Sequence, residues 1–292
     1  MIMASDQGPV VQSALLRGEL VRLRKEKQLT QEKVASDLAW SPSKLIRLEG
    51  GHSSITKVDL NALLDEYGLT SEIQRERLQA LVPGARERGW WDVYREDISP
   101  NYLNYVGYEA GAAFIRQYPG TVVPGLLQTR EYAEVLTASA VADEKKAISV
   151  VQLRLQRQSE MAKRLPRPRQ YYVLDEAVIH RHVGINKDPA IMPRQLMHIV
   201  DRTRTDERIS VRVIPFKAGE HAGLSGPFTL LEFDGDLPDI LYLDAGKGTI
   251  NMINSAEPQV AEYAENFETL LNAALSRDES LEFIRSAAAD MS

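Results

Sequence analysis

The sequence contains no cysteine. Disulfide bonds, thiolate metal sites, iron–sulfur clusters and cysteine nucleophiles are therefore excluded, and only histidine and carboxylate side chains remain as metal ligands. No stretch approaches the roughly 18 consecutive apolar residues of a membrane-spanning helix, and residues 1–13 carry neither the basic nor the apolar segment of a signal peptide. We therefore expect a cytoplasmic protein without a membrane span.

A large excess of charge of one sign is also lacking. The chain carries 35 Lys+Arg against 41 Asp+Glu, a formal charge of -6, and 43% of its residues are hydrophobic, which is typical of a globular protein. Its 292 residues suggest two domains at roughly 150 residues per domain. The charge is unevenly distributed, since Leu15–Gly50 holds eight basic and five acidic side chains. That segment is the part suited to face phosphate, while the rest would repel it.

The N-terminal part reads as a compact all-α domain. Leu16, Leu20 and Leu23 recur at spacings of four and three, which places them on one face of a helix that ends near Lys27. Four further short helices are expected up to about Leu81. We predict a flexible arm over residues 1–14, a helical domain over 15–82 and a linker over 83–89, where Pro83-Gly84 precedes a charged stretch.

Residues 90–292 show a different pattern, in which strands alternate with helices. The expected strands are rich in β-branched and aromatic residues, and they are Tyr171–Leu174, Ser210–Phe216, Phe228–Phe233 and Ile240–Asp244. The expected helices are Pro100–Gln117, Arg130–Ala138, Ile148–Arg164, Pro189–Thr205, Pro258–Ala274 and Arg277–Ala288. We predict an α+β fold class, in which the C-terminal domain has a small, mainly antiparallel sheet.

The segment 30–51, with the sequence TQEKVASDLAWSPSKLIRLEGG, carries the motif most informative about function. Thr30 is placed to cap one short helix, and Ser41-Pro42 restarts the chain as a second helix, with Ser as the cap and Pro at the first helical position. Two short helices joined by a tight turn form a helix-turn-helix, whose second helix suits the major groove of DNA.

The side chains of this motif predict a division of roles. Leu45 and Leu48 face the core, which leaves Ser43, Lys44 and Arg47 outward on one side. Serine and arginine reach base edges, lysine suits a phosphate, and Gln31 at the opening of the preceding helix can hold a backbone oxygen. The candidate DNA-binding residues are Gln31, Ser41, Pro42, Ser43, Lys44 and Arg47.

On these residues, positions 16–68 resemble the XRE-type, lambda repressor/Cro-like family of bacterial DNA-binding domains. The resemblance implies a five-helix domain in which Gln31 holds a phosphate, helix 41–49 reads the groove, and Arg24 pairs with Glu49 to support it. Two positions depart from the family pattern. Ala39 stands where glycine is usual in the turn, at a cost of up to about 1 kcal/mol if φ is positive. Ile46 stands where a small polar residue is common, and it contacts either a thymine methyl or a neighbouring side chain.

The remainder of the chain resembles the Scr-type antitoxin-like regulators. The matching segments, which lie within residues 86–275, are Gly89-Trp90-Trp91, Val123–Thr129, Leu174–Ala177, His221–Gly223 and Gly226–Phe228. For this subgroup the implied context is transcriptional regulation, often beside a gene for a small partner protein. The resemblance implies no ligand.

Two groups of side chains in the C-terminal domain allow more than one interpretation of their role. Aromatic residues near the domain junction either form a packing surface or line a ligand pocket, and the candidates for an effector or partner site are Trp90, Trp91, Tyr94 and Tyr105. His180 and His182 form an H-x-H pair. Solvated or hydrogen-bonded histidines are favoured over metal ligands, so we predict no metal site and no cofactor.

Together these patterns predict a sequence-specific, double-stranded DNA-binding transcriptional regulator, a homodimer on a palindromic operator. Its C-terminal domain would sense a small-molecule effector or a protein partner. The alternative is an antitoxin-like protein that mainly binds a small partner protein and regulates its own operon. The sequence has no nucleophile elbow, phosphate-binding loop, zinc-protease motif or dinucleotide fingerprint, so an enzyme is not expected.

Overall fold

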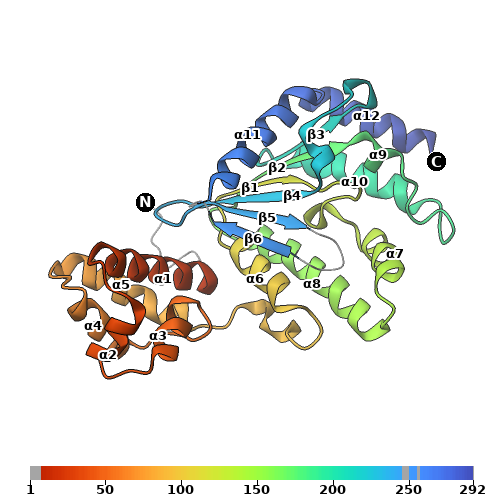
Figure 1. Ribbon diagram of the computed structural model, residues 1–292. Coiled ribbons are helices and arrows are strands. Elements are labelled where there is room, and N and C mark those ends of the chain that lie inside the picture. The colour runs from red at the N-terminus through yellow and green to blue at the C-terminus, as the bar shows by residue number, and fades with distance from the viewer. Residues whose placement is uncertain (1–7, 245–249, 255–256, 292) are drawn as a thin grey trace. The chain divides into compact units, whose positions relative to one another are not determined.

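The computed structural model describes residues 8–244, 250–254 and 257–291. The chain forms two compact units, drawn in Figure 1. The first comprises Met1–Asp92 together with Asp234–Leu237, and the second comprises Val93–Phe233 and Pro238–Ser292. Among the described residues, no helix combines the length and the apolar character needed to cross a membrane.

The first unit is all-α, as the sequence predicts. Its helices are α1 (Pro9–Glu26), α2 (Gln31–Asp37), α3 (Pro42–Glu49), α4 (Lys57–Glu66) and α5 (Glu72–Ala85). A short 3₁₀ helix, η2 (Trp90–Tyr94), follows. The core is built mainly from leucines of all these α-helices except α2, which contributes Val34. Leu16, Leu20 and Leu23 of α1 are buried in it, so the apolar face read from their spacing is confirmed.

Both ends of this domain differ from the prediction. Helix α1 begins at Pro9, so residues 9–14 of the expected arm are helical, because Pro9 is pre-set for the first helical position and Val11 is fully buried. Residues 1–7 lie outside the described part of the chain. Helix α5 also runs through Pro83-Gly84, which we expected to start the linker. The Gln12 side chain lies where a β-carbon on Gly84 would be, so the absence of one lets α1 and α5 approach closely.

The second unit is built around a six-stranded mixed sheet in the order β3-β2-β1-β4-β5-β6. The strands are β1 (Phe114–Tyr118), β2 (Arg169–Asp175), β3 (Ile209–Ile214), β4 (Phe228–Glu232), β5 (Ile240–Asp244) and β6 (Ile250–Asn254). Strands β1, β2 and β3 are parallel, whereas β4, β5 and β6 continue the sheet in antiparallel pairs. The fold is therefore α+β as predicted, and the sheet is mainly antiparallel, since the pairs β1–β4, β4–β5 and β5–β6 are antiparallel and the pairs β1–β2 and β2–β3 are parallel.

Strands β1 and β6 were not expected. The predicted helix Pro100–Gln117 ends at Glu109 as α6 (Pro100–Glu109), and the chain then enters β1 in the middle of the sheet. A charged residue in a central strand obscures the pattern, since Arg116 is stabilised there by Glu232 of β4 and Glu268 at 2.7 Å and 2.5 Å. These partners are distant in the sequence.

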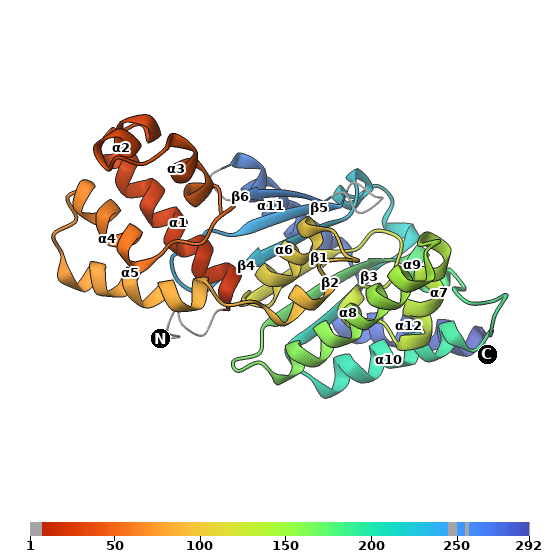
Figure 2. The same cartoon turned by 90° about the horizontal axis from the view of Figure 1, so that it is seen from below.

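Helices cover both faces of the sheet. Beyond α6 they are α7 (Arg130–Ala140), α8 (Glu144–Lys163), α9 (Glu176–His180), α10 (Ile191–Thr205), α11 (Pro258–Ala273) and α12 (Arg277–Asp290). Phe267 and Leu270 of α11 pack against Phe228, Leu230 and Leu241 on one face. Helices α6 and α8 lie on the opposite face, as Figures 1 and 2 show.

Candidate nucleic-acid interface

Helices α2 and α3 are joined by a tight turn whose ends are fixed by local hydrogen bonds. The Thr30 hydroxyl accepts a hydrogen bond from the amide of Lys33 at 3.1 Å, so Thr30 caps α2 as predicted. Ser41 has the extended backbone of a cap residue and Pro42 occupies the first position of α3, although the Ser41 side chain makes no capping bond. These signals set the start of each helix.

The turn itself depends on one left-handed residue. Ala39 has φ of +53°. This is the positive φ that would explain why glycine is usual at this position of the family pattern. The turn is closed by the amides of Ala39 and Trp40, which donate to the carbonyls of Ser36 and Ala35 at 3.1 Å and 2.7 Å. Alanine therefore occupies a backbone conformation that favours glycine.

Helix α3 presents a sharply divided surface. Leu45 is fully buried and Leu48 is 5% exposed, whereas Ser43 and Arg47, four residues apart, are both exposed. Ile46 is 46% exposed. About half of its surface is therefore accessible, and the outward face includes Ser43, Ile46 and Arg47. This face has the hydroxyl, methyl and guanidinium groups that recognise base edges.

Lys44 lies beside that face with its side chain 35% exposed, and its predicted phosphate contact stays a prediction. Its ammonium Nζ lies 2.6 Å from Asp59 Oδ1 and 3.6 Å from the centre of the Trp40 ring. Burial would raise the pKa of Asp59, but hydrogen bonds from Lys44 and Thr56 outweigh it and lower the pKa below 3.8. The Lys44 charge therefore ties α3 to α4.

An ion pair fixes the end of α3 to α1. Arg24 of α1 meets Glu49, the last residue of α3, through two hydrogen bonds of 2.7 Å and 2.8 Å, and it also donates to the Leu29 carbonyl. The two side chains are only 11% and 6% exposed. The hydrogen bond to Glu49 raises the pKa of Arg24, which stays charged. Because the pair is bidentate and shielded from water, it orients α3 relative to α1.

Gln31 belongs to the same network. Its side-chain amide donates to Glu49 Oε2 at 2.8 Å, so α2 is also linked to the end of α3. The structure therefore brings Arg24, Gln31 and Glu49 together. The phosphate contact of Gln31 stays a prediction, and this geometry requires the amide to leave Glu49 or to share its second N–H with the phosphate.

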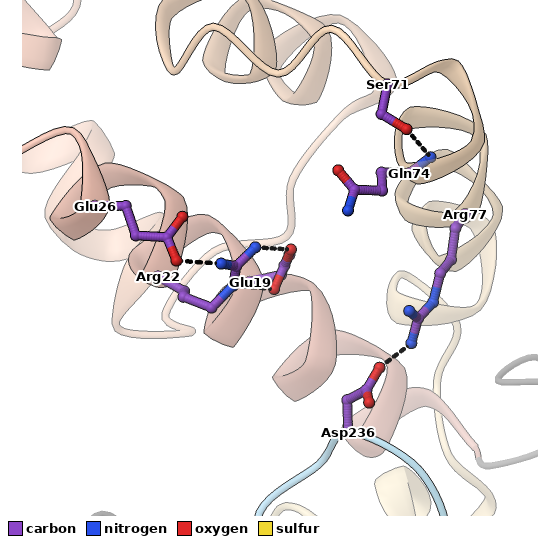
Figure 3. Close-up of polar contacts among 7 residues, drawn as sticks. All are labelled: Glu19, Arg22, Glu26, Ser71, Gln74, Arg77 and Asp236. Atoms are coloured by element: carbon purple, nitrogen blue, oxygen red, sulfur yellow. Dashed lines mark hydrogen bonds and ion pairs between the residues drawn. The ribbon is translucent and has the colours of Figure 1, made fainter.

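Several other basic residues of the first unit are neutralised by carboxylates. Arg22 on α1 lies between Glu19 and Glu26, and Arg77 on α5 pairs with Asp236 (Figure 3). Lys33 at the start of α2 pairs with Asp37 at 2.6 Å. Fewer basic side chains of this unit are therefore available for a phosphate than the count of lysines and arginines suggests.

The sequence patterns did not predict that Arg17 lies beside the end of α3. The guanidinium of Arg17, on α1, lies directly over Gly51, so close that a β-carbon there would overlap it. Gly51 follows the end of α3 and has φ of +75°. Arg17 is 34 positions away in the sequence, and no local pattern connects it with the turn after α3. The glycine at position 51 was the one feature of the sequence that could have indicated a close contact there.

Comparison with known proteins agrees with this division into two parts. Residues 15–78 match the model of a helix-turn-helix domain. Residues 102–286, more than half of the chain, match the model of a domain of unknown function, DUF5753. The chain belongs to the DUF5753 family. No curated protein and no solved structure matches the chain significantly.

The aromatic residues proposed as an effector or partner surface belong to both units, Trp90 and Trp91 to the first and Tyr94 and Tyr105 to the second. Trp90 and Trp91 pack edge to face, with ring centres 5.4 Å apart, and Trp91 is buried. Tyr94 donates to Gln156, whereas Tyr105, within the DUF5753 match, is buried against Tyr242. The burial of Trp91 and Tyr105 agrees with the packing interpretation, and a contact of these residues with an effector or partner stays a prediction.

The two histidines of the H-x-H pair have separate partners in the DUF5753 domain. His180 Nε2 lies 3.2 Å from Glu176, one turn earlier, and its ring stacks near Phe216. His182 Nε2 lies 2.8 Å from the Pro189 carbonyl. Among the described residues, no group of three or more His, Asp or Glu side chains is arranged to hold a metal ion.

Proposed function

We propose that this DUF5753 protein is a sequence-specific transcriptional regulator that binds double-stranded DNA through α3. The observation that carries the proposal is the exposed face formed by Ser43, Ile46 and Arg47 over the buried Leu45 and Leu48. An arginine contacts guanine through two hydrogen bonds, a serine accepts or donates to either base, and an aliphatic side chain contacts the thymine methyl. The match of residues 15–78 to a helix-turn-helix domain supports the same function.

The proposal includes a homodimer on a palindromic operator. One α3 contacts only a few base pairs, so a single copy would have little specificity. Two copies related by a two-fold axis would place their α3 helices in successive major grooves, with half-sites about 34 Å apart. Resemblance to XRE-type regulators supports this arrangement.

The proposal assigns a sensory role to the second unit, which would bind a small-molecule effector or a protein partner and adjust DNA affinity. The resemblance to Scr-type regulators favours a related function, in which the chain is an antitoxin-like protein that binds a small partner and regulates its own operon. We further propose that the second unit binds and does not catalyse. Turnover of a substrate by the purified protein would overturn that last point.

The test is selection of full-length protein on random and genomic duplex pools, repeated with Arg47→Ala and with Lys44→Ala. Enrichment of a palindromic site that Arg47→Ala abolishes, while Lys44→Ala weakens binding without changing the selected sequence, would support the proposal, because a phosphate contact carries no sequence information. Enrichment that survives Arg47→Ala, or a complete lack of enrichment, would contradict it. Co-purification of a small protein that prevents or promotes the enrichment would favour the antitoxin-like function.

A further inference from the structure

The second unit contains a cavity of about 180 Å³. It lies where β1 ends, and its lining includes Tyr118, the last residue of β1, and Phe228, the first residue of β4, whose rings pack with Phe267 on the other face of the sheet. Gln117, Thr229 and Tyr242 are neighbours in register across β1, β4 and β5 and form its sheet side. The carboxyl end of a parallel strand where the sheet changes direction is a frequent place for ligand sites.

The opposite wall is supported by a buried ion pair. Arg157 of α8 holds Glu109 of α6 through hydrogen bonds of 2.9 Å and 2.6 Å, and the two side chains are 5% and 2% exposed. Arg157 also donates to the Tyr102 hydroxyl, and Tyr105 donates to Glu109. Every member of this network has a partner, so the wall is rigid and the Arg157 charge is balanced.

Arg154, one turn earlier on α8, has a different environment. It lines the same cavity, and its guanidinium donates to the Gln128 side-chain oxygen at 3.0 Å and the Thr137 hydroxyl at 3.4 Å, both neutral acceptors. Among the described residues that line the cavity, the charged ones are Arg154 and Arg157. Because Glu109 balances Arg157, the wall carries a net charge of about one positive unit, which favours an anion.

Three tyrosine rings of α6 and β5 line the cavity together with apolar side chains such as Val122, Val123 and Leu136. Tyr105 and Tyr242 meet edge to face with ring centres 4.7 Å apart, and Tyr102 lies beside Tyr105 at 5.8 Å. Such walls prefer a flat ring, which can adopt offset or edge-to-face contacts with them. An aromatic cage also attracts cations, but two arginines in the wall oppose a cationic ligand.

We infer that this cavity binds a small aromatic carboxylate, with the carboxylate on Arg154 and the ring among the tyrosines. The size agrees, because a cavity of about 150 Å³ accommodates benzene, and this one is slightly larger. The inference names the effector class of the proposed function, and it depends on that function only for the effect of the ligand on DNA.

The test is calorimetric titration of the full-length protein with benzoate, benzamide and benzylammonium, which share a ring and differ in charge. Benzoate binds at one site per chain, and the other two bind at least about tenfold more weakly because they lack the charge that Arg154 requires. Equal binding of benzoate and benzamide, or no benzoate binding up to about 10 mM, would overturn the inference. This comparison needs no variant, so it does not depend on the folding of one.

Two variants then locate the site. Arg154→Gln weakens benzoate binding at least about tenfold, whereas Lys163→Gln, which removes a charge from the exposed end of the same helix, leaves it unchanged. Unchanged binding in Arg154→Gln would overturn the placement. Benzoate binding that alters affinity for the selected duplex supports the effector role, and binding without such a change overturns that role alone. Duplex selection without benzoate binding overturns the cavity inference and leaves the DNA-binding proposal intact.

Discussion

At the scale of single residues, Ala39 determines the geometry of the helix-turn-helix. Its left-handed backbone is unfavourable for a side chain with a β-carbon, yet the turn forms because the neighbouring amides are hydrogen-bonded. The buried Val34 and Ala35 on one side and Leu45 on the other hold the two helices in the core. The packing of these helices outweighs the local strain.

We predict that Ala39→Gly raises the free energy of unfolding of the helical domain by about 0.5–1 kcal/mol, because glycine adopts a positive φ without strain. Ala35→Gly is the matched control, since Ala35 is a buried helical residue and its replacement should lower stability by about 1 kcal/mol or more. Denaturant unfolding measures both. Destabilisation by Ala39→Gly would show that the methyl group makes a contact that the turn needs.

At the scale of elements, an ion pair links three helices, and its strength is testable. Arg24→Met should lower the free energy of unfolding by about 3 kcal/mol or more, because it leaves the Glu49 carboxylate buried without its partner. The double variant Arg24→Met/Glu49→Leu should recover most of that loss, since a buried pair is often replaceable by apolar side chains. Equal instability of the double variant would mean that Gln31 and Leu29 also depend on the pair.

The contact between α3 and α4 predicts a pH dependence. The pKa of Asp59 is lower in the folded protein, so its contribution to stability is complete above the unfolded pKa of about 4 and is lost as the pH falls through the folded value. Asp59→Asn should therefore lower the free energy of unfolding at pH 7 by about 1–2 kcal/mol. The difference from the unchanged protein should disappear at lower pH. A difference that stays constant from about pH 7 to pH 3 would contradict this account.

These elements also show which features of the fold could be predicted from sequence patterns. The helix starts at Gln31 and Pro42 were predictable because their caps are local, and the apolar spacing of α1 and α3 gave the buried leucines. The ion pair of Lys44 was not predictable, because its partner Asp59 lies on the next helix, 15 residues away. The central strand β1 was missed for the same reason, since the charge of Arg116 is balanced by residues more than 100 positions later.

At the scale of the whole molecule, the two proposed functions are assigned to two units with their own cores. The face suited to DNA lies on α3 in the first unit, and the cavity suited to an aromatic carboxylate lies wholly in the second. The predicted linker over residues 83–89 was close to the division after Asp92 but was too early, because α5 extends to Ala85. DNA binding by α3 and carboxylate binding by the cavity can therefore be measured separately.

The central claim is that α3 reads base pairs, and affinity for single-base variants of the selected operator tests it most directly. Full-length protein and Arg47→Ala should be compared on every base-pair substitution of one half-site. The account predicts that the unchanged protein loses about 1–3 kcal/mol of binding energy when the pair contacted by Arg47 is replaced, and that Arg47→Ala no longer distinguishes that pair. Uniform weakening of Arg47→Ala on all operators, with discrimination intact at every position, would contradict it.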